Sequence, residues 1–490
     1  MIGVHRRLSA ATRLWTSAAS GQRTNCCDRL LPRVFEKTTS KSQALNRRSF
    51  LRRAVTAPLV VSPLLASRLR GMSIPKIKDV SVIATEPAGV RLVVVKITTD
   101  QDGLYGYGCA TFTQRADLVV EAVNRYLKPF LLGRPTDAIE DLWQAMYNSS
   151  YWRNGPVLNN AISGVDQALW DVKGRQAGMP VYELLGGKCR RGAMIYSHAS
   201  GREIPETLEQ ARKLMAQGIK AVRLQVAIPG MAAYGAAQTR NPQAVEPAAG
   251  NPEPFTDDVF EPEPYVRRTL QLFETARKEL GPDIELLHDV HERVPPRLAV
   301  QFAKDMEPYR LFFLEDALSP ENIDYFKQIR ANCTTPLAMG ELFNNPHEWN
   351  TLIRDSVIDF IRVHVSEAGG LTPCRKMAAM AEAFQVKTAW HGPGDVSPIG
   401  HCANVTLDVV CYNFGIQEWT FANDHVREIF DGYPEVKDGY VYANEKPGWG
   451  VEINEKAAAK YPFGSETGSR KILNGGWGVV RRADGTVINQ

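Results

Sequence analysis

The sequence predicts an α/β protein built on a TIM-type barrel that follows a smaller α+β domain. Short apolar segments alternate with helical stretches from about residue 191 onward, and most neighbouring segments lie about 20–30 residues apart. Strands that alternate with helices at this spacing are typical of parallel βα units. About eight such units over roughly 230 residues are what a barrel of eight parallel strands requires.

The barrel is expected to span residues 191–424. Its eight candidate strands cover residues 193–199, 221–227, 284–290, 311–317, 336–342, 360–365, 386–391 and 416–421. The longest gap, residues 229–263, falls between the second and third strands and is rich in Pro, Gly, Ala, Asn and Glu. A loop of this length is uncommon in a compact domain unless it serves a function or lacks fixed structure.

Residues 74–190 are expected to form the α+β domain, and residues 425–490 are expected to pack back on it. A turn signal, Gln101-Asp102-Gly103, separates two β-rich segments, and Gly178-Met179-Pro180 ends a helical pattern. The expected strands cover residues 90–98 and 105–112, and the expected helices cover residues 118–127 and 161–177.

Residues 1–71 are excluded from the fold because they read as a basic leader. Arg47-Arg48 precedes an apolar stretch at residues 54–66, which resembles a twin-arginine export signal. We therefore expect export to the periplasm by that pathway. The alternative is translation from Met72, which would leave the protein in the cytoplasm.

The charge, the apolar stretch of the leader and the cysteine spacing each argue against one functional class. The whole chain has a net charge of +4, but the leader alone carries +12, so the rest of the chain carries −8. A mildly acidic body without a basic face does not favour nucleic-acid binding. The apolar stretch of the leader is too short and too often interrupted by proline to span a membrane. The 8 cysteines show neither CxxC nor CxxH spacing, so a zinc site is not expected.

Three acidic residues close three successive candidate strands. Asp289, Glu315 and Glu341 are separated by two equal steps of 26 residues, which is one βα unit each. Because the chemistry of a barrel gathers at the carboxyl ends of its strands, these side chains should meet at the mouth. Each acid taken alone could be a helix N-cap or a surface residue, but the equal spacing of all three favours a shared site.

Three convergent carboxylates in a partly buried site require a cation to remain ionised together. Hard oxygen ligands select Mg²⁺, with Mn²⁺ as an alternative. A cation beside a substrate carboxylate can stabilise the enediolate that forms when the adjacent C–H is deprotonated. The residues therefore predict metal-assisted abstraction of an α-proton.

Residues 74–465 resemble the enolase superfamily, which includes mandelate racemase and muconate lactonizing enzyme, and within it the mannonate dehydratase family. The metal series carries the superfamily likeness. The other matching segments are residues 161–187, Tyr151-Trp152-Arg153, Asp289-Val290-His291, His391-Gly392-Pro393-Gly394-Asp395 and Gly415-Ile416-Gln417-Glu418.

The resemblance implies a modified (β/α)₇β barrel with a capping domain made from both ends of the chain. It implies a magnesium-dependent hydro-lyase that converts a hexonate such as mannonate or gluconate to the 2-keto-3-deoxy acid. It further implies a small-molecule partner, the acid sugar, and a homo-oligomer of four or more subunits.

Catalytic roles are also carried over by the resemblance. Tyr234, in the long loop, would take the C2 proton, and Arg223 would lower the pKa of the phenol. His291 would protonate the leaving 3-hydroxyl, and its position two residues from Asp289 places both side chains on one face of the strand. The implied substrate contacts are His198, Arg362, His391, Asp395, Glu418 and Glu341.

Each role has a structural alternative. Tyr234 could be an ordinary loop tyrosine, Arg223 could pair with a structural acid, and His291 could cap a loop. His391 and Glu418 could serve as hydrogen-bonded structural residues.

Three departures from the family pattern leave the sugar acid open. Thr113 stands where asparagine is frequent, His364 adds a ring to the sixth strand, and Pro393 stands where many mannonate-active members carry alanine. One alternative is an epimerase or cycloisomerase of the same superfamily, although those commonly use a lysine pair where this chain has Arg223-Leu224-Gln225. The other is a catalytically weak protein that binds or senses acid sugars.

Overall fold

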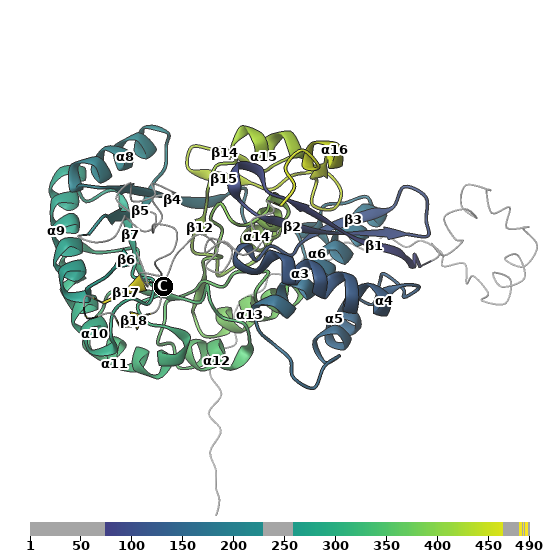
Figure 1. Cartoon of the computed structure of the whole chain (residues 1–490). Helices are drawn as coiled ribbons and strands as arrows, with labels where there is room; N and C mark the ends of the chain where they lie inside the picture. Colours follow the sequence, from purple (N-terminus) through teal and green to yellow (C-terminus); the bar gives the residue numbers. More distant parts are fainter. Residues whose placement is uncertain (1–73, 229–257, 464–479, 483, 485, 489–490) are drawn as a thin grey trace, which may run out of the picture. The chain divides into compact units, whose positions relative to one another are not determined.

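The computed structural model describes residues 74–228, 258–463, 480–482, 484 and 486–488 (Figure 1). The basic leader at residues 1–71, with its twin-arginine pair, lies outside the described residues, and so does most of the loop at 229–263. Within the described ranges, every helix is too short or too polar to cross a membrane.

The first domain contains a three-stranded antiparallel sheet. Its order is β1 (Ile77–Thr85), β2 (Leu92–Thr99) and β3 (Tyr105–Cys109). The turn between β2 and β3 contains Gly103 at φ +76°, a conformation that favours glycine. The central strand β2 buries residues on both faces, and therefore it anchors the core of this domain.

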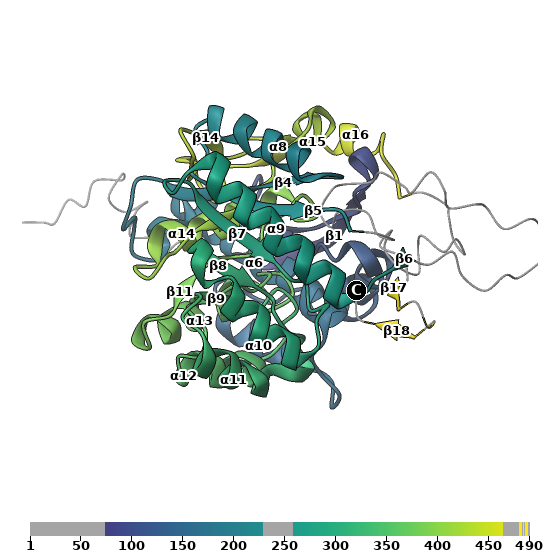
Figure 2. The ribbon, with the colours of Figure 1, turned by 90° about the vertical axis from the view of Figure 1, so that its left-hand side faces the viewer.

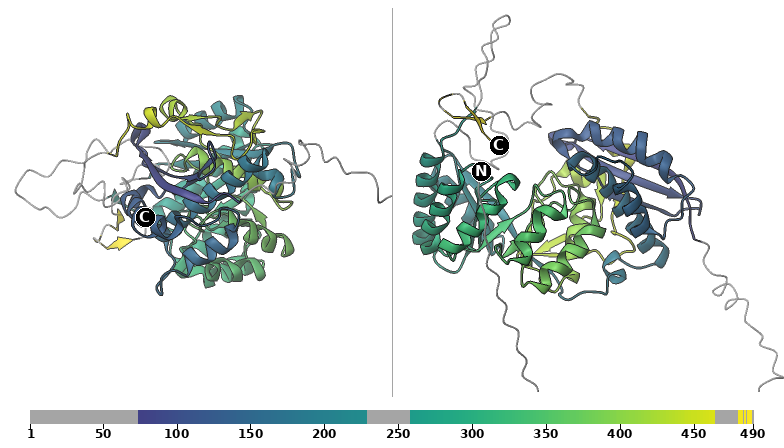
Figure 3. Two further views of the ribbon diagram at one scale, coloured as in Figure 1. Left: turned by 90° about the vertical axis from the view of Figure 1, so that its right-hand side faces the viewer. Right: turned by 90° about the horizontal axis from the view of Figure 1, so that it is seen from below.

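Helices cover the sheet of the first domain (Figure 3). They are α3 (Ala116–Ala122), α4 (Lys128–Leu131) and α6 (Pro156–Ala177), with a π-helical turn at Val123–Leu127 between α3 and α4. The helices α5 (Ile139–Tyr147) and α7 (Val181–Leu184) pack against α6. Helix α6 begins with proline, five residues earlier than its apolar pattern predicts, and ends at Gly178 with φ +68°. A Cβ on Gly108 would lie 1.9 Å from the carbonyl oxygen of Gly164, so glycine permits the close approach of β3 and α6.

The second domain is a barrel of parallel strands. They are β4 (Ala193–Gly201), β5 (Ala221–Val226), β7 (Glu285–Asp289), β8 (Phe313–Glu315), β9 (Leu337–Met339), β10 (Phe360–Ile361), β11 (Lys387–Thr388) and β12 (Gln417–Glu418). Neighbours pair in this order, β12 pairs with β4, and the bridge between Thr388 and Phe414 closes the ring. All eight expected strands are therefore present, although several are shorter than their apolar segments.

Seven helices of the described chain follow the first seven barrel strands, and α8 to α11 lie on the outside of the strands (Figure 2). They are α8 (Ile204–Ala216), α9 (Pro262–Leu280), α10 (Pro296–Asp305), α11 (Phe326–Asn332), α12 (Pro346–Arg354), α13 (Leu371–Ala383) and α14 (Pro398–Val410). The expected (β/α)₇β architecture is confirmed. The predicted end of the loop at 229–263 is wrong, because α9 already begins at Pro262.

The interior is filled by one side chain from each of the first six barrel strands, and by one residue directly after β11 and one directly before β12. This inner layer consists of Tyr196, Ala221, Leu287, Phe313, Ala338, Phe360, Ala389 and Ile416. Layers of this kind make the barrel a solid core rather than a pore, so that only its ends are open to ligands.

After the barrel, the chain returns to the first domain. This part contains α15 (Asp424–Ile429), β13 (Phe430–Asp431), β14 (Glu435–Lys437), β15 (Tyr440–Tyr442), β16 (Glu452–Ile453) and α16 (Glu455–Ala458). Asp171 of α6 accepts hydrogen bonds from the backbone N–H groups of Tyr107 (2.9 Å) and Trp449 (2.8 Å). The Trp449 indole in turn donates to the carbonyl of Tyr107 at 2.8 Å. The short strand β17 (Val480–Arg481) pairs with β18 (Val487–Ile488) and with β6 (Asp258–Val259).

Candidate active site

Three strand-end carboxylates converge as their spacing predicts. Asp289 ends β7, Glu315 ends β8 directly beside it in the sheet register, and Glu341 lies two residues beyond β9. One oxygen from each of the three carboxylates lies within 4.8 Å of the others. Asp289 and Glu315 are buried, and the side chain of Glu341 is 11% exposed.

The chain reaches Glu341 through a turn that depends on glycine. Gly340 has φ +139°, and a Cβ there would lie 3.2 Å from Phe343 and Val363. The Gly340 N–H donates to the Asp316 carboxylate at 3.1 Å. Asp316 was not predicted as a site residue, although an acidic residue directly after Glu315 in the sequence could have indicated one.

Two buried arginines lie among the carboxylates. Arg223 donates to Asp289 at 3.0 Å and approaches Glu315 and Glu418 at 3.6 Å. Its predicted role, lowering the pKa of Tyr234, involves a residue outside the described ranges, so the structure leaves that pairing as a prediction.

Arg362 follows β10 directly and is fully buried. It pairs with Glu315 at 3.0 Å, with Glu341 at 2.9 Å and with Glu418. Since all of its partners belong to this cluster, Arg362 fixes the carboxylates relative to one another.

The charge balance of the cluster fits a divalent cation. Among the described residues, two guanidinium groups pair with Asp289, Glu315, Glu341 and Glu418, which leaves two negative charges when all four acids are ionised. Burial raises the pKa of the Glu315 carboxyl well above its usual value, and the nearby Asp289 adds to this effect. A cation among these oxygens would supply the missing positive charge, and three carboxylate donors are the ligand type that Mg²⁺ prefers.

The tautomer of His198 is set by its two partners. Its Nδ1 lies 3.1 Å from the Arg223 guanidinium, which can only donate, so Nε2 carries the proton and donates to Glu418 at 2.6 Å. Burial opposes ionisation of Glu418, but Arg362 and His198 outweigh it and hold the pKa of this carboxyl well below its usual value.

His291 reaches the candidate metal ligands by a route that differs from the expected one. Its Nε2 lies 3.3 Å from Glu341, and its backbone N–H donates to Asp289 at 2.8 Å. The argument from strand alternation is wrong, because β7 ends at Asp289 and His291 has a left-handed backbone with φ +55°. The proximity holds because the chain turns back over the carboxylate.

The loop after β11 brings His391 to the same place. Its Nε2 lies 3.5 Å from Glu341, and its Nδ1 lies 3.2 Å from the Nδ1 of His364. One of these two nitrogens must carry the shared proton, and burial keeps the pKa of His364 well below its usual value. Burial also raises the pKa of Asp395 on this loop.

Tyr196 is a site residue that the sequence analysis missed. Its hydroxyl lies 3.3 Å from Glu315 and accepts a hydrogen bond from Arg362 at 3.1 Å. It lies two residues before His198 on the same strand, so alternation along β4 could have placed both on the inner face. Thr113, predicted to mark the capping loop, begins a short helical turn at Thr113–Arg115.

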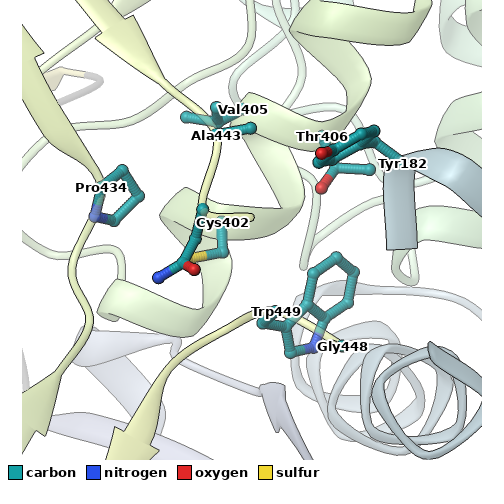
Figure 4. Close-up of a pocket in the computed structure, with 9 residues that line it drawn as sticks. Tyr182, Cys402, Val405, Thr406, Pro434, Ala443, Gly448 and Trp449 are labelled. Carbon is teal, nitrogen blue, oxygen red and sulfur yellow. The ribbon is translucent and has the colours of Figure 1, made fainter. Parts of the chain in front are cut away.

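A small cavity between α14 and the C-terminal segment contains none of the predicted site residues (Figure 4). It is lined by residues such as Cys402, Val405, Pro434 and Trp449. The candidate chemistry therefore belongs to the strand ends and not to this cavity.

A closed (β/α)₇β barrel with three convergent carboxylates at its strand ends is the framework of a metal-dependent enzyme. Two family models match the chain: the mandelate racemase/muconate lactonizing enzyme N-terminal domain over residues 75–186, and the enolase C-terminal domain-like model over residues 206–457. A D-galactonate dehydratase family member from Musicola paradisiaca is 49% identical over 85% of this chain and 99% of its own length. A second family member, from Pantoea ananatis, is 49% identical over 84% of this chain and 98% of its own.

Solved structures agree with these matches. An enolase from Pantoea ananatis with bound D-gluconate and Mg is 47% identical and superposes with a TM-score of 0.77, over 85% of this chain and 100% of that one. The 3,6-anhydro-D-galactonate cycloisomerase from Zobellia galactanivorans is 27% identical with a TM-score of 0.64, over 79% of this chain and 99% of that one. The chain therefore belongs to the enolase superfamily and, within it, to the D-galactonate dehydratase family of sugar-acid dehydratases. The expected superfamily is confirmed, whereas mannonate as the family's substrate here stays a prediction.

Proposed function

We propose that this protein is a Mg²⁺-dependent dehydratase that converts a hexonate, D-gluconate or D-mannonate, to the 2-keto-3-deoxy acid. The observation that carries the proposal is the convergence of Asp289, Glu315 and Glu341 within 4.8 Å, beside His291. The relative with bound D-gluconate and Mg supports both the metal and the class of substrate.

Asp289, Glu315 and Glu341 would hold the cation, with Mn²⁺ as an alternative to Mg²⁺. When bound there, the cation would stabilise the negative charge that develops on the substrate carboxylate as the neighbouring C–H loses its proton. The two buried arginines hold the carboxylates in place before substrate arrives, so little reorganisation is required of the protein.

Removal of the proton at C2 is assigned to Tyr234, and Arg223 would favour the phenolate form of its side chain. The guanidinium of Arg223 is itself held by Asp289 at 3.0 Å and lies 3.1 Å from His198. It is therefore fixed within β5, the strand that precedes Tyr234 in the sequence.

Departure of the 3-hydroxyl is assigned to His291. A general acid must lie within reach of the leaving oxygen. The 3.3 Å distance from its Nε2 to Glu341 places the imidazole at the edge of the proposed metal site. Contacts to the rest of the acid sugar are assigned to His198, Arg362, His391, Asp395 and Glu418.

A cycloisomerase or epimerase is the second candidate, because the Zobellia galactanivorans cycloisomerase shares the fold at 27% identity. Arg223-Leu224-Gln225 lacks the lysine pair that such reactions commonly use, which favours dehydration. A weak binder or sensor of acid sugars is disfavoured because the sequence contains Asp289, His291 and Tyr234 together.

A screen of acid sugars tests the proposal. The purified protein, supplied with Mg²⁺, is incubated with aldonic acids that include D-gluconate, D-mannonate and D-galactonate, and 2-keto-3-deoxy products are quantified. Product from a hexonate is expected. Exchange of the C2 proton without product would support the epimerase alternative, and binding without exchange or product would support the sensor.

We also propose that residues 1–71 direct twin-arginine export to the periplasm, and that the mature protein is a tetramer or larger homo-oligomer. N-terminal sequencing of protein from the native host tests the first proposal, since a cytoplasmic form that begins at Met72 would contradict it. Light scattering tests the second, and a monomeric mass would contradict it.

A further inference from the structure

The loop at residues 390–395, which carries His391, is bound through its backbone. The Gln417 amide donates to the carbonyl of Trp390 at 3.0 Å, and the Asn404 amide donates to the carbonyl of His391 at 2.8 Å. The N–H of residue 392 donates to Glu418 at 3.0 Å. These contacts hold the loop from β12, through Gln417 and Glu418, and from α14, through Asn404.

His401, three residues before Asn404 on α14, also binds the backbone of this loop. Its Nε2 lies 3.1 Å from the carbonyl oxygen of Gly392 and 3.2 Å from that of Pro393. The ring is only 3% exposed. Because both partners can only accept, Nε2 must carry the proton.

Tyr433 fixes the opposite nitrogen of this ring. In the neutral imidazole Nδ1 is an acceptor, and the Tyr433 hydroxyl lies 3.0 Å from it and 3.1 Å from the carbonyl oxygen of Thr420, so the hydroxyl proton faces two acceptors. Trp419 packs against both rings, with centroids 4.9 Å from His401 and 5.3 Å from Tyr433. Burial lowers the pKa of His401 to about 4, so the ring is neutral near pH 7. The contacts form a chain from the C-terminal segment, through α14, to the loop.

We propose that His401, oriented by Tyr433, is a positioning residue that holds the loop at 390–395 and thereby presents His391 to the bound acid sugar. The partners of His401 named above are loop carbonyls, Tyr433 and Trp419, and none is a proposed metal ligand, so we expect its replacement to affect substrate binding more than metal binding. The inference rests on the proposed function for the identity of the ligand, but the placement of the loop can be measured without any ligand.

Amide hydrogen exchange tests the placement directly. The His401→Phe variant replaces the imidazole with another aromatic ring that has no nitrogen to donate or accept a hydrogen bond. Exchange in the loop at 390–395 is expected to accelerate about 10-fold in this variant, the equivalent of one lost hydrogen bond. His401→Gln retains an amide that can donate to the loop carbonyls, and it should restore most of the protection. His425→Phe, an exposed histidine on α15, serves as the matched control and should match the wild type.

Kinetics separate positioning from general stability. With Mg²⁺ and the hexonate that the wild type accepts, His401→Phe should raise KM about 10-fold, change kcat less than threefold and leave the Kd for Mg²⁺ within twofold. Tyr433→Phe should raise KM in the same direction by a smaller factor, which provides a second variant if His401→Phe folds poorly.

Two results would overturn the inference. If the amides at 390–395 exchange at the wild-type rate in both His401→Phe and Tyr433→Phe, His401 does not hold the loop. A loss of Mg²⁺ affinity that parallels the change in KM, without rescue by His401→Gln, would show a general structural role. If the wild type turns over no acid sugar, the proposed function fails, whereas the exchange experiment still decides whether His401 holds the loop.

Discussion

The two sides of the candidate site are built differently. On the metal side, Asp289 and Glu315 end neighbouring strands, and Arg223 and Arg362 pair with their side chains. On the substrate side, His391 lies on a loop whose position depends on backbone hydrogen bonds from Asn404 and other residues. The metal side is therefore set by strand register and charge, whereas the substrate side is set by loop contacts. We infer that the first decides whether the chemistry occurs and that the second decides which acid sugar undergoes it.

The strongest test of the metal side is Glu315→Gln. The amide keeps the shape of the side chain but removes one negative charge and weakens an oxygen ligand. Turnover is expected to fall at least about 10³-fold, since several kcal/mol of charge stabilisation would be lost. Mg²⁺ binding, measured by calorimetry, should weaken in parallel. Glu274→Gln makes the same change at an exposed position of α9 and should have no effect; wild-type activity in Glu315→Gln would contradict the assignment.

His291 lies 3.3 Å from Glu341, and its replacement should separate the two proton transfers. His291→Asn is expected to slow dehydration about 10²–10⁴-fold, the usual contribution of a general acid. In D₂O this variant should still exchange the C2 proton, because Tyr234 and the carboxylates remain. Tyr234→Phe should lose exchange and dehydration together. If His291→Asn lost exchange as completely as Tyr234→Phe, the assignment of His291 to the 3-hydroxyl would be wrong.

The smallest effect is expected from the substrate-side loop. A Cβ on Gly392 would lie 2.5 Å from the Gln417 amide and 2.6 Å from the Glu418 carbonyl, so Gly392→Ala must displace the loop. A cost of about 1–3 kcal/mol in stability and a rise in KM of about 10-fold are expected, with the Kd for Mg²⁺ unchanged. On the same loop, Gly394→Ala would meet only the side chain of Thr420 at 3.3 Å, and it should bind substrate nearly as the wild type does. Equal KM values in the two variants would contradict the distinction between the two sides.

The same distinction explains what the sequence could predict. Asp289, Glu315 and Glu341 were visible because one βα unit repeats, so equal steps along the chain become neighbouring positions around the barrel. Strand lengths were less visible. The apolar run at 360–365 predicts a strand of six residues, but β10 covers only Phe360–Ile361. Beyond it, Val363 and Val365 stay buried while the backbone makes only single hydrogen bonds, such as that from the His391 N–H to the Val363 carbonyl at 3.1 Å. A hydrophobic pattern therefore reports burial and not the extent of regular strand pairing.

Contacts on the substrate side have no local signal. His401 and Tyr433 are 32 residues apart, and only the folded chain brings them together. His291 shows the intermediate case: its place near Asp289 was predicted, but the left-handed turn at φ +55° was not, because nothing in the residue types requires it. Tyr234, the proposed base, lies outside the described residues and remains assigned by resemblance.

The measurement that tests the central claim most directly is metal titration of chelator-treated protein. The enzyme is stripped with EDTA, dialysed, and assayed for dehydration of a hexonate as Mg²⁺ is added back. We predict no turnover in the stripped protein and full recovery at one Mg²⁺ per chain, with Glu315→Gln failing to recover. Full activity in stripped protein shown to contain no divalent metal would contradict the claim that Asp289, Glu315 and Glu341 form the catalytic metal site.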